Sequence, residues 1–302
     1  MYNYDLKPQH DPYVQVAEKA MQSLSDPAFV SLAEAIPPLR YLPAWFSGAG
    51  FQKLARETKE ATDAMLEIPT EFVRKRVERG YTSDNPCLMT DLLKYCKTQE
   101  DDTALKEAAA TGYLAGADTT SSALGTFFYA MALHPHFQKK AQEEIDMITD
   151  GDRLPIWEDR ASMPYLEAIL REVMRWKAIT PLGLSHSTTE DDVYQGATVV
   201  PNIWAMTHDG QIYQNPEVFD PGRFLTPDGH LTDDDFWYAI ANILAVFEID
   251  RKKDANGNYL PLEVEYSNTL VSHAQPFECS IKPRSQSISQ IVLQEHAAAA
   301  KG

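Results

Sequence analysis

The feature that most constrains the fold is a long run from Asp101 to Leu133, which has a helical pattern but no polar face. The run starts with acidic residues, which the positive end of a helix dipole favours. It then becomes almost wholly small and apolar, through Ala108, Ala109, Ala110, Leu114, Ala115, Ala117, Ala123, Leu124, Phe127 and Phe128. A helix that is apolar on most sides is buried inside a large domain. We therefore predict a central buried helix that ends at His134-Pro135.

Gly116, Asp118 and Thr119 interrupt this apolar helix. Glycine inside a helix costs ~1 kcal/mol relative to alanine, and an ionisable Asp in an apolar wall must be paired, hydrated or neutralised. One interpretation is a helix-packing notch that contains a satisfied Asp118. The other is a locally opened helix, in which Gly116 lets a flat ligand approach the backbone while Asp118 and Thr119 pass protons to it. The residues alone leave both interpretations open.

Composition limits the class of protein. The chain has 302 residues, of which 44% are hydrophobic, and a formal net charge of −17. The acidity argues against non-specific nucleic-acid binding, which needs a basic face. The cysteines, Cys87, Cys96 and Cys279, have no metal-binding spacing, and their small, odd number fits a reducing compartment. No metal site, signal peptide or run of ~18 apolar residues stands out, so we expect the chain as written to be soluble and cytoplasmic.

The remaining pattern predicts a mainly α fold with small β-sheets. Further helices are expected at Tyr13–Ser25, Phe51–Arg79, Phe137–Met147, Pro164–Lys177 and Phe236–Ile249. Strands are expected at Ala197–Val200, Asn202–Thr207, Leu260–Tyr266 and Phe277–Ile281. Asn256-Gly257 is a strong hairpin signal. Asp254, Asn256 and Asn258 match part of a calcium loop, but a plain hairpin is the favoured interpretation because tyrosine replaces the sharp-turn glycine.

Several motifs occur in the order of one known family. Ala115–Thr120 matches the oxygen-activation motif in the long central helix of cytochromes P450. Glu172–Arg175 matches the Glu-x-x-Arg motif of that family. Phe219–Phe224 is similar to its Pro-Glu-Arg-Phe segment, with Gly222 in place of the usual Glu. The approach from Leu154 to Leu166 also looks like the family's. The ordered set resembles the cytochrome P450 family, in particular its fungal microsomal members.

The resemblance implies roles for individual residues. Glu172, Arg175 and Arg223 would form a buried structural triad that fixes the meander around the haem, although from the residues alone Glu172 and Arg175 look like a solvated ion pair worth only ~0.2–0.5 kcal/mol. Asp118 and Thr119 would be the catalytic residues that deliver protons for oxygen activation. The cofactor-binding residues implied by the family are Gly116, beside the haem, and His186, on a haem propionate. His208 also matches a family pattern and is expected to be structural.

The resemblance also implies an organisation and a cellular setting. Residues 1–302 would be one partial cytochrome P450 domain, divided into substrate-cover helices (1–100), the central helix (101–134), the Glu-x-x-Arg helix with sheet and meander (135–225), a final helix and β-hairpin (235–282) and a tail (283–302). The implied cofactor is haem b. The implied partners are an NADPH-cytochrome reductase and a hydrophobic small-molecule substrate. The family is typical of the cytosolic face of the endoplasmic reticulum, and its membrane anchor and first sheet would precede Met1.

One expected motif is absent. The family binds the haem iron through a cysteine loop just before its final helix, but here residues 227–234 lead directly into Asp235 and no cysteine lies between Cys96 and Cys279. Cys279, which matches a terminal-hairpin position, and His230 are poor substitutes. Two hypotheses remain open. The first is a monooxygenase that oxidises a hydrophobic small molecule, in fungal secondary or xenobiotic metabolism. The second is a catalytically inactive truncated remnant, or a faulty gene model, that does not bind haem.

Overall fold

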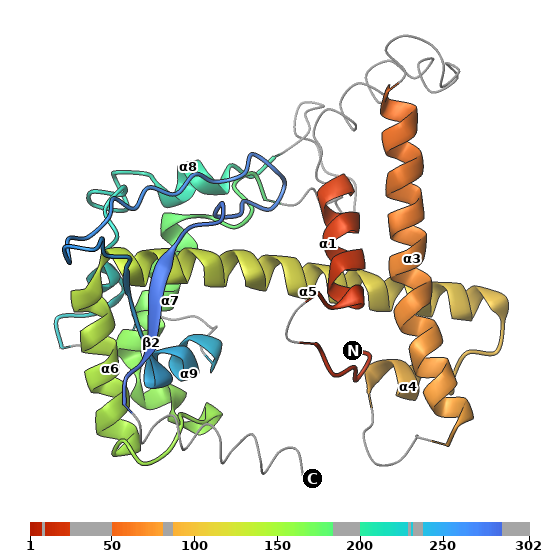
Figure 1. The fold of residues 1–302 in the computed structure, drawn as a ribbon, viewed down its shortest axis with the longest axis horizontal. Helices are drawn as coiled ribbons and strands as arrows, with labels where there is room; N and C mark the ends of the chain where they lie inside the picture. The colour runs from red at the N-terminus through yellow and green to blue at the C-terminus, as the bar shows by residue number, and fades with distance from the viewer. Residues whose placement is uncertain are drawn as a thin grey trace. The chain divides into compact units, whose positions relative to one another are not determined.

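The computed structural model describes residues 1–7, 10–24, 50–80, 87–183, 200–228, 231 and 238–285. The chain divides into two compact units, Met1–Thr120 and Ser121–Gly302. The described residues are mainly helical, with one small antiparallel sheet (Figure 1). This confirms the predicted mainly α class with a small β component. His186, His230 and most of the expected strand at Ala197–Val200 lie outside the described residues.

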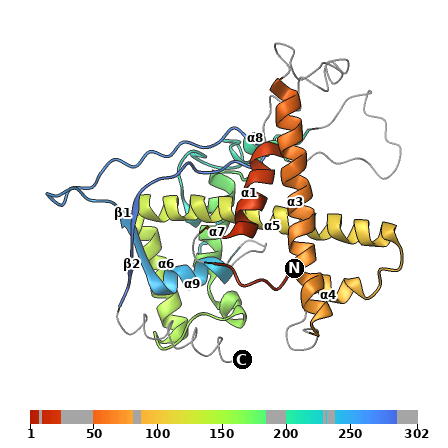
Figure 2. The same cartoon turned by 45° about the vertical axis from the view of Figure 1, so that its right-hand side comes forward.

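The first unit is built on a pair of helices, α1 (Pro12–Leu24) and α3 (Gly50–Glu78), which lie side by side in both views (Figures 1 and 2). They are followed by the short α4 (Leu88–Leu93) and by the beginning of α5 (Gln99–Leu133). The bounds of α1, α3 and α5 confirm the predicted helices to within two residues, and α3 continues through Pro69. The short helix α4 was not predicted. Within the described residues of this unit, buried apolar side chains pack in two clusters, which are Ala20, Ala61, Met65 and Ala110, and Tyr2, Val73, Met89, Leu105 and Ala109.

The second unit gathers the remaining elements around the end of α5. They are α6 (Pro135–Thr149), the 3-10 turn η2 (Trp157–Ser162), α7 (Pro164–Trp176), α8 (Ile203–Thr207), the 3-10 turn η3 (Pro221–Phe224), α9 (Tyr238–Val246), β1 (Phe247–Arg251) and β2 (Cys279–Pro283). Pro135 and Pro164 each occupy the first turn of a helix, where the missing N–H costs nothing. The bounds of α6 and α7 confirm the predicted helices. Ten of the thirteen residues of α7 are buried, so this helix is the centre of the unit's core.

The sheet pairs β1 with β2 in antiparallel register, with Ile249 opposite Ile281. The prediction of a strand near Phe277–Ile281 is confirmed with a shift of two residues. The prediction of a helix up to Ile249 is wrong in its last three residues, because the chain leaves α9 at Val246 and becomes strand β1 at Phe247. The reason is tertiary, since the backbone of this segment bonds to β2 on one edge and to side chains of α6 on the other.

Two other strand predictions are corrected by local geometry. The segment predicted as a strand at Asn202–Thr207 is helix α8, and the side-chain oxygen of Asn202 caps it by accepting a 3.0 Å hydrogen bond from the backbone of Ala205. In the segment predicted as a strand at Leu260–Tyr266, the only β-bridge involves Tyr266, which pairs with Ala274. Short apolar runs fit either period, and here the cap decided for helix.

The predicted hairpin turn at Asn256-Gly257 is confirmed. Lys253 and Tyr259 form an antiparallel bridge across it, and Gly257 has a φ of +84°, which glycine adopts without strain. One oxygen of the Asp254 carboxylate accepts hydrogen bonds of 2.8 Å and 2.9 Å from the backbone of Asn256 and Asn258. The acidic side chain therefore closes the turn, as in the plain hairpin interpretation.

Candidate functional site

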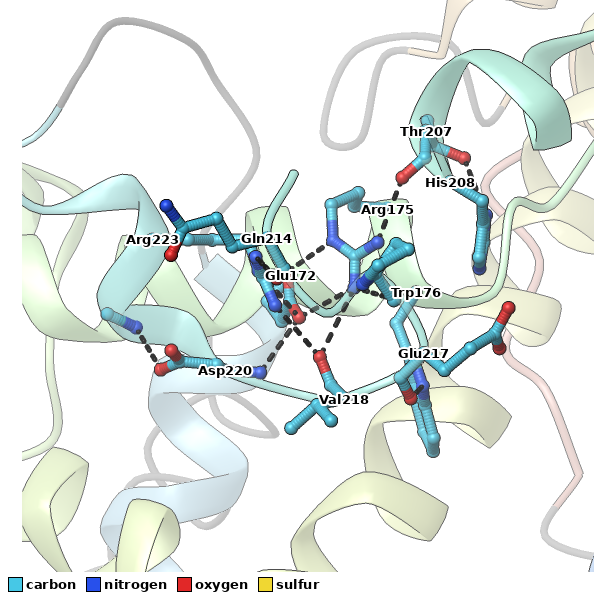
Figure 3. Close-up of polar contacts among 12 residues, drawn as sticks. Glu172, Arg175, Trp176, Thr207, His208, Gln214, Glu217, Val218, Asp220 and Arg223 are labelled. Atoms are coloured by element: carbon cyan, nitrogen blue, oxygen red, sulfur yellow. Dashed lines mark hydrogen bonds and ion pairs between the residues drawn. The ribbon is translucent and has the colours of Figure 1, made fainter. Parts of the chain in front are cut away.

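The candidate site centres on an ion pair within α7. The carboxylate of Glu172 accepts two hydrogen bonds from the guanidinium of Arg175, 2.7 Å from Nε and 2.8 Å from Nη2 (Figure 3). The Glu172 side chain is fully buried and that of Arg175 is 2% exposed. An interpretation of this pair as a solvated surface contact is therefore wrong. Three-residue spacing places both groups on one side of the helix, and the rest of the unit covers that side.

A second arginine reaches the same carboxylate from a distant part of the chain. Arg223, in η3, lies with its Nε 3.1–3.2 Å from the two oxygens of Glu172. The backbone N–H of Asp220 donates a further hydrogen bond of 2.8 Å to the same side chain (Figure 3). The structure thus brings Glu172, Arg175 and Arg223 together around one buried carboxylate. Bidentate guanidinium bonds of this kind need the planar fork of arginine.

The two arginines also hold the backbone of the irregular segment between α8 and η3. Arg175 donates to the carbonyl oxygens of Thr207 at 2.9 Å and Pro216 at 2.8 Å. Arg223 donates to the carbonyl oxygens of Gln214 and Val218, both at 2.9 Å. A buried carbonyl needs a hydrogen-bond partner, and a loop has few of its own. The network therefore supplies the bonds that regular secondary structure would otherwise provide.

Sequence reasoning missed two buried groups on the same helix. Trp176 donates a 2.9 Å hydrogen bond from its indole N–H to the carbonyl oxygen of Glu217 (Figure 3). Glu167 is 2% exposed and is held by Arg160 at 3.2 Å and by Arg171 at 3.5 Å. Both residues lie among apolar residues of α7, so the one-sided pattern of the helix gives no sign that their polar groups are buried and hydrogen-bonded. The available signal was the density of Glu and Arg on a helix that is otherwise strongly apolar.

The stretch Gly116–Thr119 of α5 is a continuous part of the helix, so the interpretation of a locally opened helix, one of the two left open by the sequence, is not supported. The Thr119 hydroxyl donates a 2.7 Å hydrogen bond to the carbonyl oxygen of Ala115, one turn earlier. Gly116 is exposed, and a β-carbon built on it would meet no atom within 4 Å. Asp118 is half-buried. The prediction that α5 is buried on most sides is therefore wrong for the Ala115–Ala117 turn, while its C-terminal half is buried around Phe127 and Met131.

His208 has only local contacts among the described residues. Its ring stacks on Trp204 at a centroid distance of 4.6 Å, and its Nδ1 lies 2.9 Å from the carbonyl oxygen of the same residue. This arrangement caps the end of α8 and fits the structural role expected for this histidine. His186 and His230, the other two histidines considered from the sequence, lie outside the described residues.

Each of the three cysteines has a local structural setting of its own. Cys87 caps α4, with its Sγ 3.4 Å from the backbone nitrogen of Thr90, and the Cys96 Sγ donates to the carbonyl oxygen of Leu92 at 3.7 Å. Cys279 lies in β2, packed against the core, and burial raises the pKa of its thiol, which opposes formation of a thiolate. The sequence from Leu231 to Trp237, which leads into α9, contains no cysteine or histidine.

The residues present therefore do not fit a haem held by a cysteine thiolate. Among the residues that the structure describes, no group of three or more His, Cys, Asp or Glu side chains is arranged to hold a metal ion either. Nor does any helix in the described ranges combine the length and apolarity needed to cross a membrane.

Comparisons with known proteins identify the class to which this fold belongs. A family model described as "Cytochrome P450" matches residues 3–238. A cytochrome P450 monooxygenase of Armillaria gallica is 34% identical, covering 97% of this chain and 64% of the relative. The monooxygenase claR of Ampulloclitocybe clavipes is 36% identical, covering 92% and 57%. The multifunctional monooxygenase af510 of Aspergillus fumigatus is 30% identical, covering 94% and 60%.

The chain belongs to the cytochrome P450 family. It spans about three-fifths of the length of these curated relatives. Membership explains why the motifs on α5, α7 and η3 occur in their observed order, and it brings haem into consideration as the family's cofactor. The activity, substrates and partners of a whole protein do not follow from membership alone.

Proposed function

We propose that this chain derives from a monooxygenase that oxidises a hydrophobic small molecule, using haem b, O2 and electrons from an NADPH-cytochrome reductase. The proposed setting is fungal secondary or xenobiotic metabolism at the cytosolic face of the endoplasmic reticulum. The observation that carries the proposal is the buried carboxylate of Glu172 held by Arg175 and Arg223. The names of the fungal relatives, which are monooxygenases, support the reaction class.

Within this proposal two residues of α5 transfer protons, and a third leaves space for the haem. Asp118 and Thr119 are the proposed catalytic residues, since a carboxylate and a hydroxyl can each accept and release a proton. Gly116 and His186 are the proposed cofactor-binding residues, and the absence of a side chain at Gly116 leaves its face of the helix open. When bound, the haem would supply the oxidation chemistry, while the protein would position and isolate the substrate.

The proposal requires an iron ligand that this sequence does not provide. The test is therefore to sequence the transcript across the junction of Asp234 and Asp235. We expect an in-frame segment that encodes a cysteine loop. The protein made from that transcript should bind haem and, after reduction under carbon monoxide, show the Soret band of thiolate ligation. A transcript that contains the segment but yields haem-free protein would overturn the proposal.

A second candidate is a haem-free, catalytically inactive protein. The specific observation in its favour is that Cys87 and Cys96 bond to their own helix α4, while Cys279 is packed against the core of the second unit. If the transcript runs directly from Asp234 to Asp235 and the purified chain contains no haem, this candidate replaces the first. A Soret band typical of thiolate ligation from the chain as written would exclude it.

A further inference from the structure

A cleft on the first unit has a composition that is unusual for so acidic a chain. It has a volume of about 430 Å³ and lies along α3, with one wall from α1. Its lining residues are Tyr13, Glu67, Ile68, Glu71, Phe72, Lys75, Arg76 and Arg79. The seven residues from α3 recur at three- and four-residue intervals, so they form one continuous face of the helix. The volume lies within the range of small-molecule sites, about 300–1,000 Å³.

The apolar wall of the cleft is a preformed aromatic surface. Tyr4, Tyr13 and Phe72 form an aromatic trio with centroid separations of 4.0 Å, 5.3 Å and 5.8 Å. Two of the three rings line the cleft, and Ile68, which is 41% exposed, extends the apolar surface along α3. Tyr13 and Phe72 meet edge to face, with an interplanar angle of 70°. Rings that already pack against one another offer an apolar contact without a large cost in side-chain entropy.

The residues that line the cleft include three cations and two carboxylates, although the chain as a whole has a net charge of −17. Of the two carboxylates, Glu67 lies 2.7 Å from Lys106 of α5, and Glu71 lies 3.4 Å from Lys75. Arg76 stands over the Phe72 ring at 5.6 Å and donates to the carbonyl oxygen of Asn3 at 2.7 Å.

Arg79 is the cation best placed to receive a ligand. It is exposed at the end of the cleft, and within the described parts of the chain no carboxylate lies within ion-pair distance of its side chain. The two acids that line the cleft, Glu71 and Glu67, lie beside Lys75 and Lys106, so they do not compete for Arg79.

We propose that this cleft is a binding site for a small amphipathic anion, with an apolar aromatic body against Tyr13, Phe72 and Ile68 and a single acidic head at Arg79. The chemistry of the walls selects this class. A neutral apolar molecule would leave the guanidinium unused, and a small inorganic anion would leave the aromatic surface uncovered. The site shares no residue with Glu172, Arg175 and Arg223 or with Gly116–Thr119, so it is independent of the proposed oxidation chemistry.

Isothermal titration of the full chain with 2-naphthoate and with 2-naphthamide tests the proposal, because the two probes share a ring system and differ in charge. We expect measurable binding of naphthoate, weaker binding of naphthamide, and a loss of naphthoate affinity as ionic strength rises, since exposed charges are screened beyond ~10 Å at 0.1 M salt. Equal affinities for the two probes, or no naphthoate binding at millimolar concentration, would overturn the proposal.

Variants on α3 locate the site. Arg79→Gln is expected to weaken naphthoate roughly threefold to fivefold, the range of an exposed ion pair, and to leave naphthamide unchanged. Ile68→Ser should weaken both probes by roughly threefold, through lost apolar contact. Arg56→Gln is the matched control, because Arg56 is an exposed arginine of the same helix that does not line the cleft. Equal losses in Arg56→Gln and Arg79→Gln would show general charge attraction and reject the site.

The acidic headgroup of a membrane lipid is an alternative ligand with similar chemistry. Sedimentation of the chain with phosphatidylcholine vesicles that contain phosphatidylglycerol distinguishes this alternative from a soluble anion. We expect the chain to remain in the supernatant and naphthoate binding to be unaffected by the vesicles. Pelleting that disappears in Arg79→Gln would assign the cleft to a membrane surface instead and overturn the proposal.

Discussion

The side chain of Gln138 forms two hydrogen bonds with the backbone of Ile249, donating to its carbonyl oxygen at 2.7 Å and accepting from its N–H at 2.8 Å. Gln142, one turn further along α6, donates to the carbonyl oxygen of Phe247 at 3.0 Å. Four helical residues rise about 6 Å, and two strand residues about 6.7 Å. Because the two repeats nearly match, a pair of glutamines can cover the edge of β1 that faces away from β2.

Replacing Gln138 with leucine should therefore destabilise the second unit. Ile249 is fully buried, and the variant leaves its N–H and carbonyl without partners, at a cost of about 2–4 kcal/mol for the two groups. Urea unfolding followed by tryptophan fluorescence measures the loss, and hydrogen exchange at the Ile249 amide localises it. Lys139→Leu, at an exposed position of the same helix, is the control and should change stability by less than about 0.5 kcal/mol. Similar losses in both variants would contradict the edge-covering role.

Glu172→Gln tests the buried network. The substitution keeps the shape of the side chain but leaves Arg175 as a buried charge without its counter-ion, which typically costs about 3–5 kcal/mol. The comparison is Glu278→Gln, which removes the partner of Lys252 in a pair whose side chains are 75% and 50% exposed. That change should cost at most about 1 kcal/mol. The loss of stability is measured by thermal unfolding of both variants, and the soluble yield of each is recorded. Equal losses of stability in the two variants would show that burial of the Glu172 ion pair is not important.

Glu144 should give the chain a component of stability that decreases as pH rises. Its carboxylate accepts 2.9 Å hydrogen bonds from the backbone of Tyr165 and Leu166 at the start of α7. Burial nevertheless raises its pKa above the ordinary 4.5, which outweighs these bonds and Lys140. A raised pKa in the folded state means that the contribution is present below pH 4.5 and is lost as pH rises through the folded pKa. The stability of the chain relative to Glu144→Gln should therefore fall as pH rises above the ordinary pKa of 4.5.

The neighbouring Glu143→Gln is the control for this experiment, since the Glu143 side chain is 61% exposed. The difference in the free energy of unfolding between Glu143→Gln and the unmodified chain should change less with pH than the difference for Glu144→Gln. If the stability difference for Glu144→Gln rises with pH instead, the bonds to α7 dominate over burial, and the direction of the pKa shift is wrong.

His134 should act in the opposite direction. Burial, with a smaller effect from His136, lowers its pKa below the ordinary 6.5, and its ring stacks on Phe219 at a centroid distance of 5.3 Å. A base with a lowered folded-state pKa contributes stability above pH 6.5, and that stability is lost as pH falls through the folded pKa. His134→Phe should remove this dependence, so its stability relative to the unmodified chain should increase from about pH 7 to pH 5. An exposed histidine variant, His10→Gln, serves as the control.

The long helices could be predicted because their signals are local. Acidic residues or prolines mark the starts of α5, α6 and α7. Helices α6 and α7 carry enough residues to establish a period, and α5 was predicted from its long run of small and apolar residues. The strand β1 could not be predicted, since its apolar run continues that of α9. Its state depends on Gln138, which lies 111 residues away from Ile249. The start of α8 had a local signal in Asn202, which the strand interpretation overlooked.

The candidate site was predicted unevenly for a similar reason. The motif resemblance named Glu172, Arg175 and Arg223, but the residues alone suggested a solvated pair, because their partners lie 32 to 51 positions further along the chain. Nothing local distinguishes a glutamate on the surface from one that is covered by a distant loop. On α5 the converse error occurred, since an apolar composition suggested burial at Gly116, which is exposed.

The hydrogen bonds from Arg175 and Arg223 have a consequence for the order in which the second unit opens. Loops are usually the first parts of a protein to become accessible to proteases and to exchange their amide hydrogens. Here the irregular segment from Thr207 to Val218 cannot separate from the unit without breaking the bonds to Arg175 and Arg223 and exposing Glu172 to solvent. This loop is therefore expected to resist cleavage by proteases until α7 itself unfolds. A segment without regular secondary structure would then belong to the most stable cooperative unit of the protein.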